Sequence, residues 1–343
     1  MKNVVVLSFG TEKEWKRAIF TVLSFWSWFE GNEQNVRVLI YTDNPEYFAS
    51  YLKDFKVSYV NISLAEIKKS VEKTGYMYRF KISVVERTFT HYPNDDLLFV
   101  DTDTFFIVNP HRLLEELQPG KSFMHLREYT FDEGIYKWLK PSTPATQRYP
   151  RDFINLIENK SFSIVNQEIK FNRFQYVWNS GVLGFTNEIV PYLPDVYALT
   201  DEFYAKSAWR ISEQIAFTLV LNQVTKISEA VKYLNHYWFY KDRVDLRLDE
   251  FLNHNFRSLS LLEKKAAVKK LTQKMDKLIY HEQMVTNTKE SVHDKDYVSA
   301  FKFAAKALFG VPLNDDLIKI LKYRFSKLAS LVFLSALDGL SYI

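Results

Sequence analysis

The sequence contains no cysteine, which excludes disulfide bonds and thiolate metal sites. It also lacks any apolar stretch of about 18 residues, the length at which a membrane-spanning helix would be expected. The apolar run Val4–Phe9 is short and has no small-residue cleavage site after it, so we interpret it as a buried strand rather than a signal peptide. A net charge of only +4 argues against a nucleic-acid partner. Together these absences predict a cytoplasmic protein.

The composition is that of a folded soluble protein, with 47% hydrophobic and 25% charged residues among 343. This length accommodates one large α/β domain with an appendage, and we place the boundary between residues 1–250 and 251–343. Residues 251–343 hold 15 lysines and arginines against 9 acidic residues, whereas the rest of the chain holds 30 against 32. The positive excess is therefore confined to the C-terminal segment.

Strand patterns alternate with helical patterns through the first 245 residues. Runs of β-branched residues predict the strands, and apolar residues at helical spacing predict the helices. The alternation predicts a mostly parallel, Rossmann-like sheet with helices on both faces and a helical C-terminal extension. The predicted strands are Val4–Phe9, Val36–Tyr41, Val57–Ile62, Asp96–Val100, Gly181–Phe185 and, as the last strand of the sheet, Val231–His236. The predicted helices are Glu12–Phe29, Tyr76–His91, Glu188–Ala205 and Ser212–Asn222, with further helices from Leu259 and an irregular insertion over Tyr129–Ser161.

Two aspartates follow the apolar run Leu97–Val100 in the segment LLFVDTDTFF. In open α/β sheets ligands bind outside the carboxyl ends of the strands, which is where Asp101 and Asp103 lie. At a spacing of two their carboxylates can converge, and two convergent negative charges demand a cation. Hard oxygen ligands suit Mn²⁺ or Mg²⁺, with phosphate oxygens completing the shell. The alternative is a turn in which the two aspartates accept backbone hydrogen bonds.

Two further segments carry residues suited to such a site. YMYRFK places Arg79 and Lys81 on the helix that leads into the strand, where basic residues could pair with phosphates. The alternative for either residue is a solvated helix face. NSGVLGF holds Gly181 and Gly184, and a glycine pair in a strand indicates close approach of backbone or ligand, or a bulge.

Two later segments contribute polar side chains. SEQ offers Glu213 and Gln214 at the start of a helix, where capping is the simpler explanation. HYWFYK offers His236 and Lys241. A histidine beside aromatic residues is as readily a core residue as a ligand.

In their order along the chain, these segments resemble a GT-A-type glycosyltransferase, most closely the glycogenin-like retaining class (family 8). The resemblance covers about residues 1–245 and rests on VVVLSFG, YTD, YRFK, LLFVDTDTFF, NSGVLGF, SEQ and HYWFYK in succession. It implies a metal-dependent enzyme that moves a sugar from a nucleotide-diphosphate donor to a hydroxyl of a glycan or lipid-linked acceptor. The implied cofactor is Mn²⁺ or Mg²⁺.

The resemblance also implies roles for individual residues. The metal ligands would be Asp101, Asp103 and His236. Glu213 would be the catalytic residue near the anomeric carbon, with Asn179 and Gln214 lining the donor sugar; in an inverting enzyme, Glu213 or Asp132 would be the base. The donor-binding residues would be Ser8, Phe9, Gly10, Thr11, Thr42, Asp43, Arg79, Lys81, Asp101, Thr102, Asp103, Ser180, Gly181 and Lys241.

The chain departs from the family pattern in ways that leave stereochemistry and acceptor open. The stretch between DTD and NSG is long, the acidic-Gln pair has Glu where Asp is usual, and HYWFYK lacks the family's Gly and its Lys-Pro-Trp. A haloacid-dehalogenase-type phosphatase would instead use Asp101 as nucleophile, but its motif requires Thr or Val where Phe105 stands. A non-catalytic sugar-binding protein on the same fold is the third interpretation.

The basic C-terminal segment suggests a partner of its own. Lys264, Lys265, Lys269 and Lys270 form a cluster in sequence, and Tyr323–Leu340 mixes basic and apolar residues at helical spacing, as interfacial helices do. This pattern predicts peripheral membrane contact through the C-terminal helices. A solvated face over an ordinary helical subdomain would show the same spacing.

Overall fold

The computed structural model describes residues 1–138 and 151–310. The chain divides into two compact units, an N-terminal unit over Met1–Lys269 and a C-terminal unit that begins at Lys270. The division falls inside the long helix α12 (Leu261–His293). The predicted boundary at residue 250 is not tested by this division and stays a prediction.

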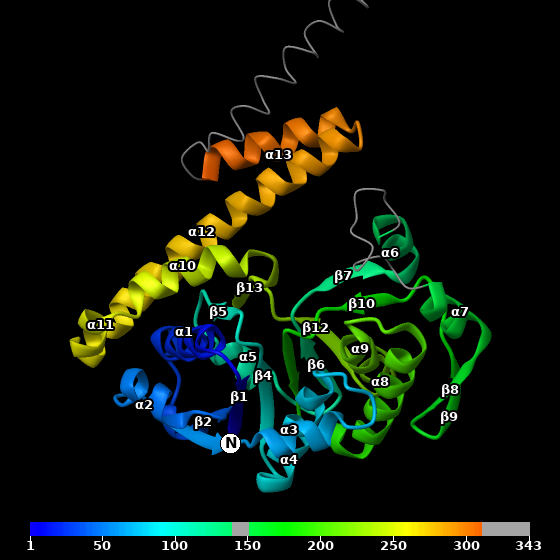
Figure 1. Cartoon of the computed structure of the whole chain (residues 1–343), viewed down its shortest axis with the longest axis horizontal. Helices are drawn as coiled ribbons and strands as arrows, with labels where there is room; N and C mark the ends of the chain where they lie inside the picture. The colour runs from blue at the N-terminus through cyan, green and yellow to red at the C-terminus, as the bar shows by residue number, and fades with distance from the viewer. Residues whose placement is uncertain (139–150, 311–343) are drawn as a thin grey trace, which may run out of the picture. The chain divides into compact units, whose positions relative to one another are not determined.

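A seven-stranded sheet forms the centre of the N-terminal unit, in the order β12-β6-β11-β4-β1-β2-β3 (Figure 1). Within this sheet, β11 runs antiparallel to its neighbours β4 and β6, and the other pairings are parallel. The prediction of a mostly parallel α/β sheet with added C-terminal helices is therefore confirmed. The strands are β1 (Lys2–Ser8), β2 (Val36–Thr42), β3 (Val57–Asn61), β4 (Asp96–Val100), β6 (Lys121–Met124), β11 (Val182–Phe185) and β12 (Lys226–Glu229).

Helices cover both faces of the sheet because side chains alternate along each buried strand. Val5, Leu39 and Phe99 point into one hydrophobic core, which also contains apolar residues of α4, α8 and α9. Their buried neighbours, such as Val4 and Val6, face the other layer, where α1 packs with α2 and α10 (Figure 1). These helices are α1 (Glu12–Trp28), α2 (Pro45–Leu52), α4 (Arg79–His91), α8 (Leu193–Ser207), α9 (Ser212–Val224) and α10 (Lys241–Phe251). Shorter helices are α3 (Leu64–Val71), α5 (His111–Glu115) and α11 (His254–Ser258).

Local sequence explains where the first helices begin. Thr11 caps α1 by accepting a hydrogen bond from the backbone N–H of Glu14. Asn44 caps α2, whose first residue is Pro45. Ser63 and Glu66 form a reciprocal capping box at α3. These three signals fix the direction of the chain as it leaves β1, β2 and β3.

The last predicted strand does not belong to the main sheet. Residues Leu234–His236 form β13, which pairs antiparallel with β5 (Thr104–Phe106) in a separate ladder that sets His236 opposite Thr104. The edge of the main sheet is instead β12, which pairs with β6. The prediction that Val231–His236 completes the sheet was therefore wrong, and the ladder that replaces it holds His236 beside the two aspartates.

Two other predictions are corrected by the structure. The helix expected over Glu188–Ala205 begins as the 3₁₀ helix η3 (Asn187–Tyr192), because Pro191 cannot donate an α-helical hydrogen bond, and α8 follows. The region expected to be irregular contains regular elements in its described part, while Pro141, Pro144 and Pro150 lie outside the described residues. These elements are the end of β7 (Arg127–Thr130), α6 (Phe131–Trp138), α7 (Arg151–Asn159) and the start of β8 (Ser161–Ile164). The strands β9 (Gln167–Lys170) and β10 (Tyr176–Trp178) follow this region.

The C-terminal helices α12 and α13 (Tyr297–Gly310) pack through small and apolar side chains. Met284 and Val285 of α12 form a buried cluster with Ala304 and Ala307 of α13. Nowhere in residues 1–138 and 151–310 is there a helix with the length and apolarity needed to cross a bilayer. The predicted interfacial stretch over residues 323–340 lies outside the described residues.

The lysine cluster of the sequence is largely paired with carboxylates. Lys264 is fully buried, and its Nζ lies 2.6 Å from the Asp54 carboxylate. Lys265 and Lys269 each lie 3.5 Å from a glutamate, Glu33 and Glu30 respectively. Three of the four lysines therefore make ion pairs within the N-terminal unit, to which the start of α12 belongs.

Candidate metal and donor-sugar site

Asp101 and Asp103 follow the carboxyl end of β4, in the three-residue connection before β5. The backbone N–H of Asp101 donates to the Gly181 carbonyl at 2.9 Å, which extends the β4–β11 ladder by one bond. The Thr104 hydroxyl donates to the Asp101 carbonyl at 2.8 Å. The connection is thus fixed by backbone contacts, and both carboxylates remain available to the site.

Asp101, Asp103 and His236 each offer a ligand atom, and these atoms lie within 4.8 Å of one another. Two carboxylate oxygens and one imidazole nitrogen on this scale match the ligand set expected for Mn²⁺ or Mg²⁺, and the imidazole favours the former. The structure therefore brings together the three residues that the sequence named as metal ligands. Their role as ligands stays a proposal.

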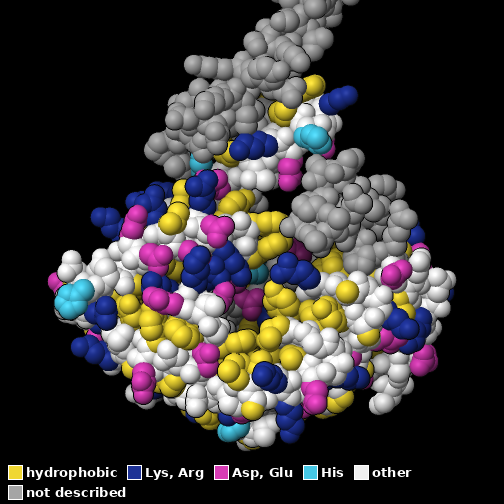
Figure 2. Space-filling model, in the orientation of Figure 1, with side chains coloured by type: hydrophobic (Ala, Val, Ile, Leu, Met, Phe, Trp, Pro, Cys, Tyr) yellow, Lys and Arg dark blue, Asp and Glu magenta, His cyan; other side chains and the backbone are white. Residues whose placement is uncertain are grey.

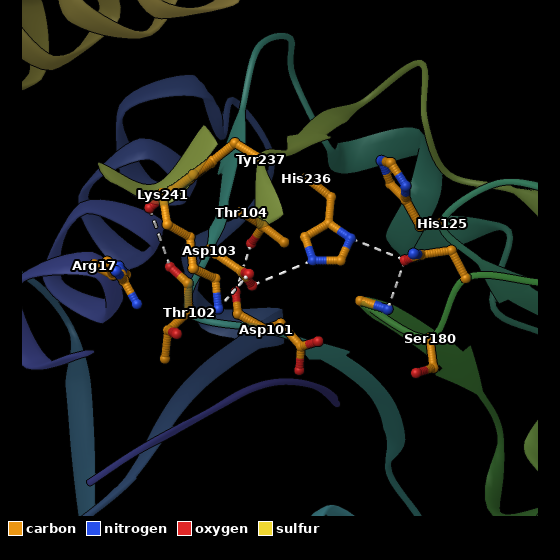
Figure 3. A network of polar contacts seen from close by, with 12 residues as sticks. Arg17, Asp101, Thr102, Asp103, Thr104, His125, Ser180, His236, Tyr237 and Lys241 are labelled. Atoms are coloured by element: carbon orange, nitrogen blue, oxygen red, sulfur yellow. Dashed lines mark hydrogen bonds and ion pairs between the residues drawn. The ribbon is translucent and has the colours of Figure 1, made fainter. Parts of the chain in front are cut away.

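Asp103 lies between two basic side chains of the site. Its carboxylate is buried, with one oxygen 3.2 Å from His236 Nε2 and the other 2.9 Å from Lys241 Nζ (Figure 3). Burial alone raises the pKa of Asp103, but the charges and hydrogen bonds of His236 and Lys241 outweigh it and hold that pKa far below the ordinary value. Asp103 is therefore ionised, as a metal ligand must be.

His236 is oriented through both of its ring nitrogens. Burial lowers the pKa of His236, but the Asp103 carboxylate more than compensates, so that the pKa is raised overall. Its Nδ1 lies 2.9 Å from the Asn179 side-chain oxygen. The ring also lies against Gly181, where an added Cβ would come within 2.4 Å of it. Gly181 is thus a site of close approach, as the sequence suggested, and the neighbour it accommodates is the candidate ligand.

Of the two basic residues in YRFK, Lys81 reaches the site. Its buried Nζ lies 3.0 Å from Asp101, 3.0 Å from Glu213 and 3.1 Å from the Ser180 carbonyl. Burial lowers the pKa of Lys81, but the two carboxylates raise it by more, so the ammonium stays charged. The structure does not bring Arg79 to this cluster. Arg79 Nε instead lies 2.6 Å from Asp201.

Glu213 and Gln214 open α9 but do not cap it, since the helix has no side-chain N-cap bond. Glu213 accepts a hydrogen bond from the Ser180 hydroxyl at 2.8 Å. The side-chain oxygen of Gln214 lies 3.4 Å from the Ser180 backbone N–H, and its side-chain nitrogen donates to Glu128 at 3.0 Å. The capping explanation is therefore wrong, and both residues face the NSG segment.

Glu128 is a site residue that sequence reasoning missed. Its carboxylate accepts one hydrogen bond from the side chain of Asn179 and one from that of Gln214, each at 3.0 Å. In sequence it is an ordinary charged residue beside Arg127 and Tyr129, and both partners lie far along the chain. Asp132, the alternative base, lies 3.5 Å from Arg173 and is not part of this network.

The predicted nucleoside-binding residues lie at the ends of β1 and β2. Asp43 accepts hydrogen bonds from the Gly10 backbone N–H at 2.9 Å and the Trp15 indole at 3.0 Å, and thereby joins the two strand ends. Gly10 adopts a φ of +92°, which favours glycine. Ser8 is buried, and its hydroxyl has no hydrogen-bond partner within residues 1–138 and 151–310.

The remaining predicted residues of this region have local partners. Phe9 packs edge-on against Phe80, with ring centroids 5.9 Å apart. Thr42 accepts from the Asn44 backbone N–H at 3.2 Å. Thr102 donates its hydroxyl to Glu14 at 2.7 Å. Figure 2 shows the resulting face as a hollow with histidine and acidic atoms at its floor and basic and hydrophobic side chains around it.

No protein-family model matches the chain, and no curated protein sequence matches it significantly. Among solved structures, it is similar to the apo form of mouse xyloside xylosyltransferase 1, with 15% identity and a TM-score of 0.41 over 66% of this chain and 85% of that one. It is also similar to galactosyltransferase LgtC in complex with donor and acceptor sugar analogues, with 9% identity and a TM-score of 0.40 over 64% and 70%. At these identities and TM-scores the similarity carries no argument about activity, which must rest on the site itself.

Proposed function

We propose that the chain is a metal-dependent glycosyltransferase that moves a sugar from a nucleotide-diphosphate donor to a hydroxyl acceptor. The observation that carries the proposal is the convergence of Asp101, Asp103 and His236 at the carboxyl end of β4. A parallel sheet places ligands at this end, and two carboxylates with an imidazole are suited to a divalent ion that shares phosphate oxygens. Lys81 and Lys241 beside them supply positive charge for the diphosphate.

Asp101, Asp103 and His236 would hold Mn²⁺, or Mg²⁺, which when bound neutralises the negative charge that develops on the departing diphosphate. Lys241 is the more exposed of the two lysines, and its contact with Asp103 holds its ammonium beside the three candidate ligands. It is therefore our candidate for a direct contact with the diphosphate. Lys81 is buried and fixes the Asp101 carboxylate.

Glu213 is suited to positioning rather than to reacting. Its carboxylate is buried, is neutralised by Lys81 at 3.0 Å and accepts from the Ser180 hydroxyl at 2.8 Å. We therefore propose that Glu213 fixes Lys81 and Ser180, while the amides of Asn179 and Gln214 line the donor sugar.

The acceptor site is proposed to include an exposed aromatic pair. Trp238 and Phe239 are 40% and 61% exposed in the 3₁₀ helix η4 (Trp238–Tyr240), between His236 and Lys241. The backbone N–H of Tyr237 donates to the Asp103 carbonyl at 2.9 Å, which fixes this turn beside the metal cluster. An exposed aromatic face can pack against the apolar face of a pyranose ring, so we propose a glycan acceptor. Trp238→Ala should raise KM for the acceptor and leave donor binding unchanged; a loss of donor binding would contradict this assignment.

A thermal-shift screen tests the proposal, since a ligand that binds the native state raises Tm. With Mn²⁺ present, one class of nucleotide sugar should raise Tm, and excess EDTA should remove the shift. Asp103→Asn should lose both this shift and sugar transfer, whereas Asp96→Asn makes the same change at the opposite end of β4 and should lose neither. Full transfer by Asp103→Asn, or in excess EDTA, would refute the metal-dependent mechanism. Hydrolysis of an aryl phosphate would favour the phosphatase interpretation.

A further inference from the structure

Glu128 on β7 connects two amide side chains of the site. Its two carboxylate oxygens accept hydrogen bonds from Asn179 Nδ2 and Gln214 Nε2, each at 3.0 Å. An ionised carboxylate can only accept hydrogen bonds, so it fixes which end of each amide faces it. The nitrogen of each amide therefore points to Glu128, and the oxygen points away.

The fixed orientation of Asn179 determines that its side-chain oxygen, and not its nitrogen, faces the His236 ring. The Asn179 side-chain oxygen lies 2.9 Å from His236 Nδ1 and 2.9 Å from the Gly181 backbone N–H. Because this oxygen accepts, Nδ1 must carry a proton, and the lone pair of the neutral ring is then on Nε2. Nε2 is the nitrogen that faces Asp103, at 3.2 Å. Figure 3 shows His236 with one nitrogen toward Asp103 and the other directed away from it.

We propose that Glu128 is a positioning residue that orients the metal ligand His236 through Asn179. The inference rests on the proposed function, because it assumes that His236 binds a divalent ion. A partner behind a ligating histidine fixes its tautomer and ring orientation, and removing such a partner lowers metal affinity by about 10–100-fold. Here two hydrogen bonds act in series, one between the Glu128 carboxylate and the Asn179 amide and one between that amide and the His236 imidazole.

A purely structural role for Glu128 is disfavoured by two observations. The segment that carries Asn179 is already joined to the start of β7 by backbone hydrogen bonds, through the β7–β10 ladder and from the Asn179 N–H to the Leu126 carbonyl at 2.9 Å. Glu128 is also half-buried without an ion pair to any lysine or arginine of residues 1–138 and 151–310. Burying a carboxylate without a cation costs stability, and a neutral glutamine could join two strands at lower cost. A glutamine has only one accepting terminal atom, its oxygen, so it cannot accept a hydrogen bond from an amide nitrogen at each of its two terminal atoms.

The test is the binding of Mn²⁺ alone to the full chain, followed by electron paramagnetic resonance. The signal of free Mn²⁺ gives Kd, and nitrogen modulation of the bound signal reports an imidazole ligand. Glu128→Gln should raise Kd by about tenfold and weaken the modulation, since its amide nitrogen would turn one partner amide around. Glu133→Gln is the matched control. It removes a carboxylate that accepts the Thr130 backbone N–H at 2.8 Å, and it should leave both readings unchanged.

Two further variants separate the possible failures. Gln214→Met removes the other amide and should leave Kd unchanged, because the proposed coupling runs through Asn179. Asn179→Leu should reproduce the effect of Glu128→Gln, and it carries the test if Glu128→Gln does not fold. Wild-type Kd and modulation in a folded Glu128→Gln variant would overturn the positioning role. Unchanged nitrogen modulation in His236→Ala would instead refute the proposed metal ligand, independently of Glu128.

Discussion

Gly181 and Gly184 lie in the same short segment, yet a methyl group added at each would meet different neighbours. At Gly181 the Cβ would lie 2.4 Å from the His236 ring, whereas at Gly184 it would lie 2.9 Å from Leu117 and 3.2 Å from Phe123. Gly181→Ala should therefore displace His236 and lower Mn²⁺ affinity. Gly184→Ala should overpack the core and cost about 1–3 kcal/mol of stability with metal affinity kept. Mn²⁺ titration and urea unfolding of both variants check this, and equal metal affinities would contradict it.

The lowered pKa of His125 predicts that the free energy of unfolding decreases in acid. Burial, aided by nearby His236, lowers the pKa of His125 to about 3 from an ordinary 6.5. Between these values the unfolded chain binds a proton that the native state excludes, so this group's contribution is present above pH 6.5 and is lost as the pH falls. The loss is about 1.4 kcal/mol per pH unit.

His125→Phe removes this titration and keeps a ring of similar shape. Relative to the wild type, the variant should therefore gain about 2 kcal/mol between pH 6.5 and pH 5. His236 acts in the opposite sense, because its raised pKa adds stability that is lost as the pH rises, but this contribution is common to both proteins. Urea unfolding at the two pH values measures the difference. A pH-independent difference would show that His125 binds its proton equally well in the native state and in the unfolded chain.

At the scale of elements, two of the ion pairs between helices α1 and α10 differ in character. Arg17 and Asp245 are both buried and make two hydrogen bonds, at 2.7 and 2.6 Å, whereas Lys16 and Asp249 meet at 2.7 Å with Asp249 half exposed. Asp245→Asn should cost about 3 kcal/mol, because it removes the buried carboxylate that makes two hydrogen bonds to Arg17 and leaves that buried charge with Glu14 alone. Asp249→Asn should cost less than about 1 kcal/mol. Thermal and urea unfolding compare the two, and similar costs would contradict the argument from burial.

The elements that could be predicted from sequence are those whose own residues specify them. β4 contains the apolar run Leu97–Val100, and α1 has a cap and an apolar face, so the sequence predicts both elements closely. β13 and β5 have three residues each and exist because they pair with each other. A segment so short has no periodicity to read, and for this reason Val231–His236 was assigned to the wrong sheet.

Site residues also differ in whether local sequence or contacts with distant segments reveal them. Asp101, Asp103 and Lys81 could be named from local motifs, because the strand and helix that present them are visible in sequence. Glu128 could not be named, since its importance comes from contacts with Asn179 and Gln214, which belong to distant segments. The preference for Lys81 over Arg79 likewise depends on the direction in which α4 presents each side chain.

At the scale of the whole molecule, the positive charge of the C-terminal segment is only partly free for a membrane. Lys264, Lys265 and Lys269 are paired with carboxylates, so they add little attraction to anionic lipid. On α13, Val298 and Leu308 are 82% and 40% exposed. Lys302 and Lys306 are exposed on the same helix, which contains no acidic residue. Peripheral contact, which stays a prediction, would therefore use α13.

Lys302→Glu combined with Lys306→Glu should abolish salt-sensitive co-sedimentation with anionic vesicles, since each lysine near the surface contributes about 1 kcal/mol. Lys265→Glu is the control and should leave sedimentation nearly unchanged, because Lys265 is already paired with Glu33. Equal sedimentation with neutral vesicles, or none at low salt, would leave α13 a solvated helix.

The ladder between β5 and β13 also bears on how the protein is made. Synthesis runs from the N-terminus, so Asp101 and Asp103 leave the ribosome well before His236, which completes the cluster. A nascent chain that holds only the two aspartates offers a divalent ion an incomplete set of ligands. In the proposed metal site, tight capture of the ion would await the pairing of β13 with β5. Metal loading would therefore report that translation has passed residue 236 and that β13 has paired with β5.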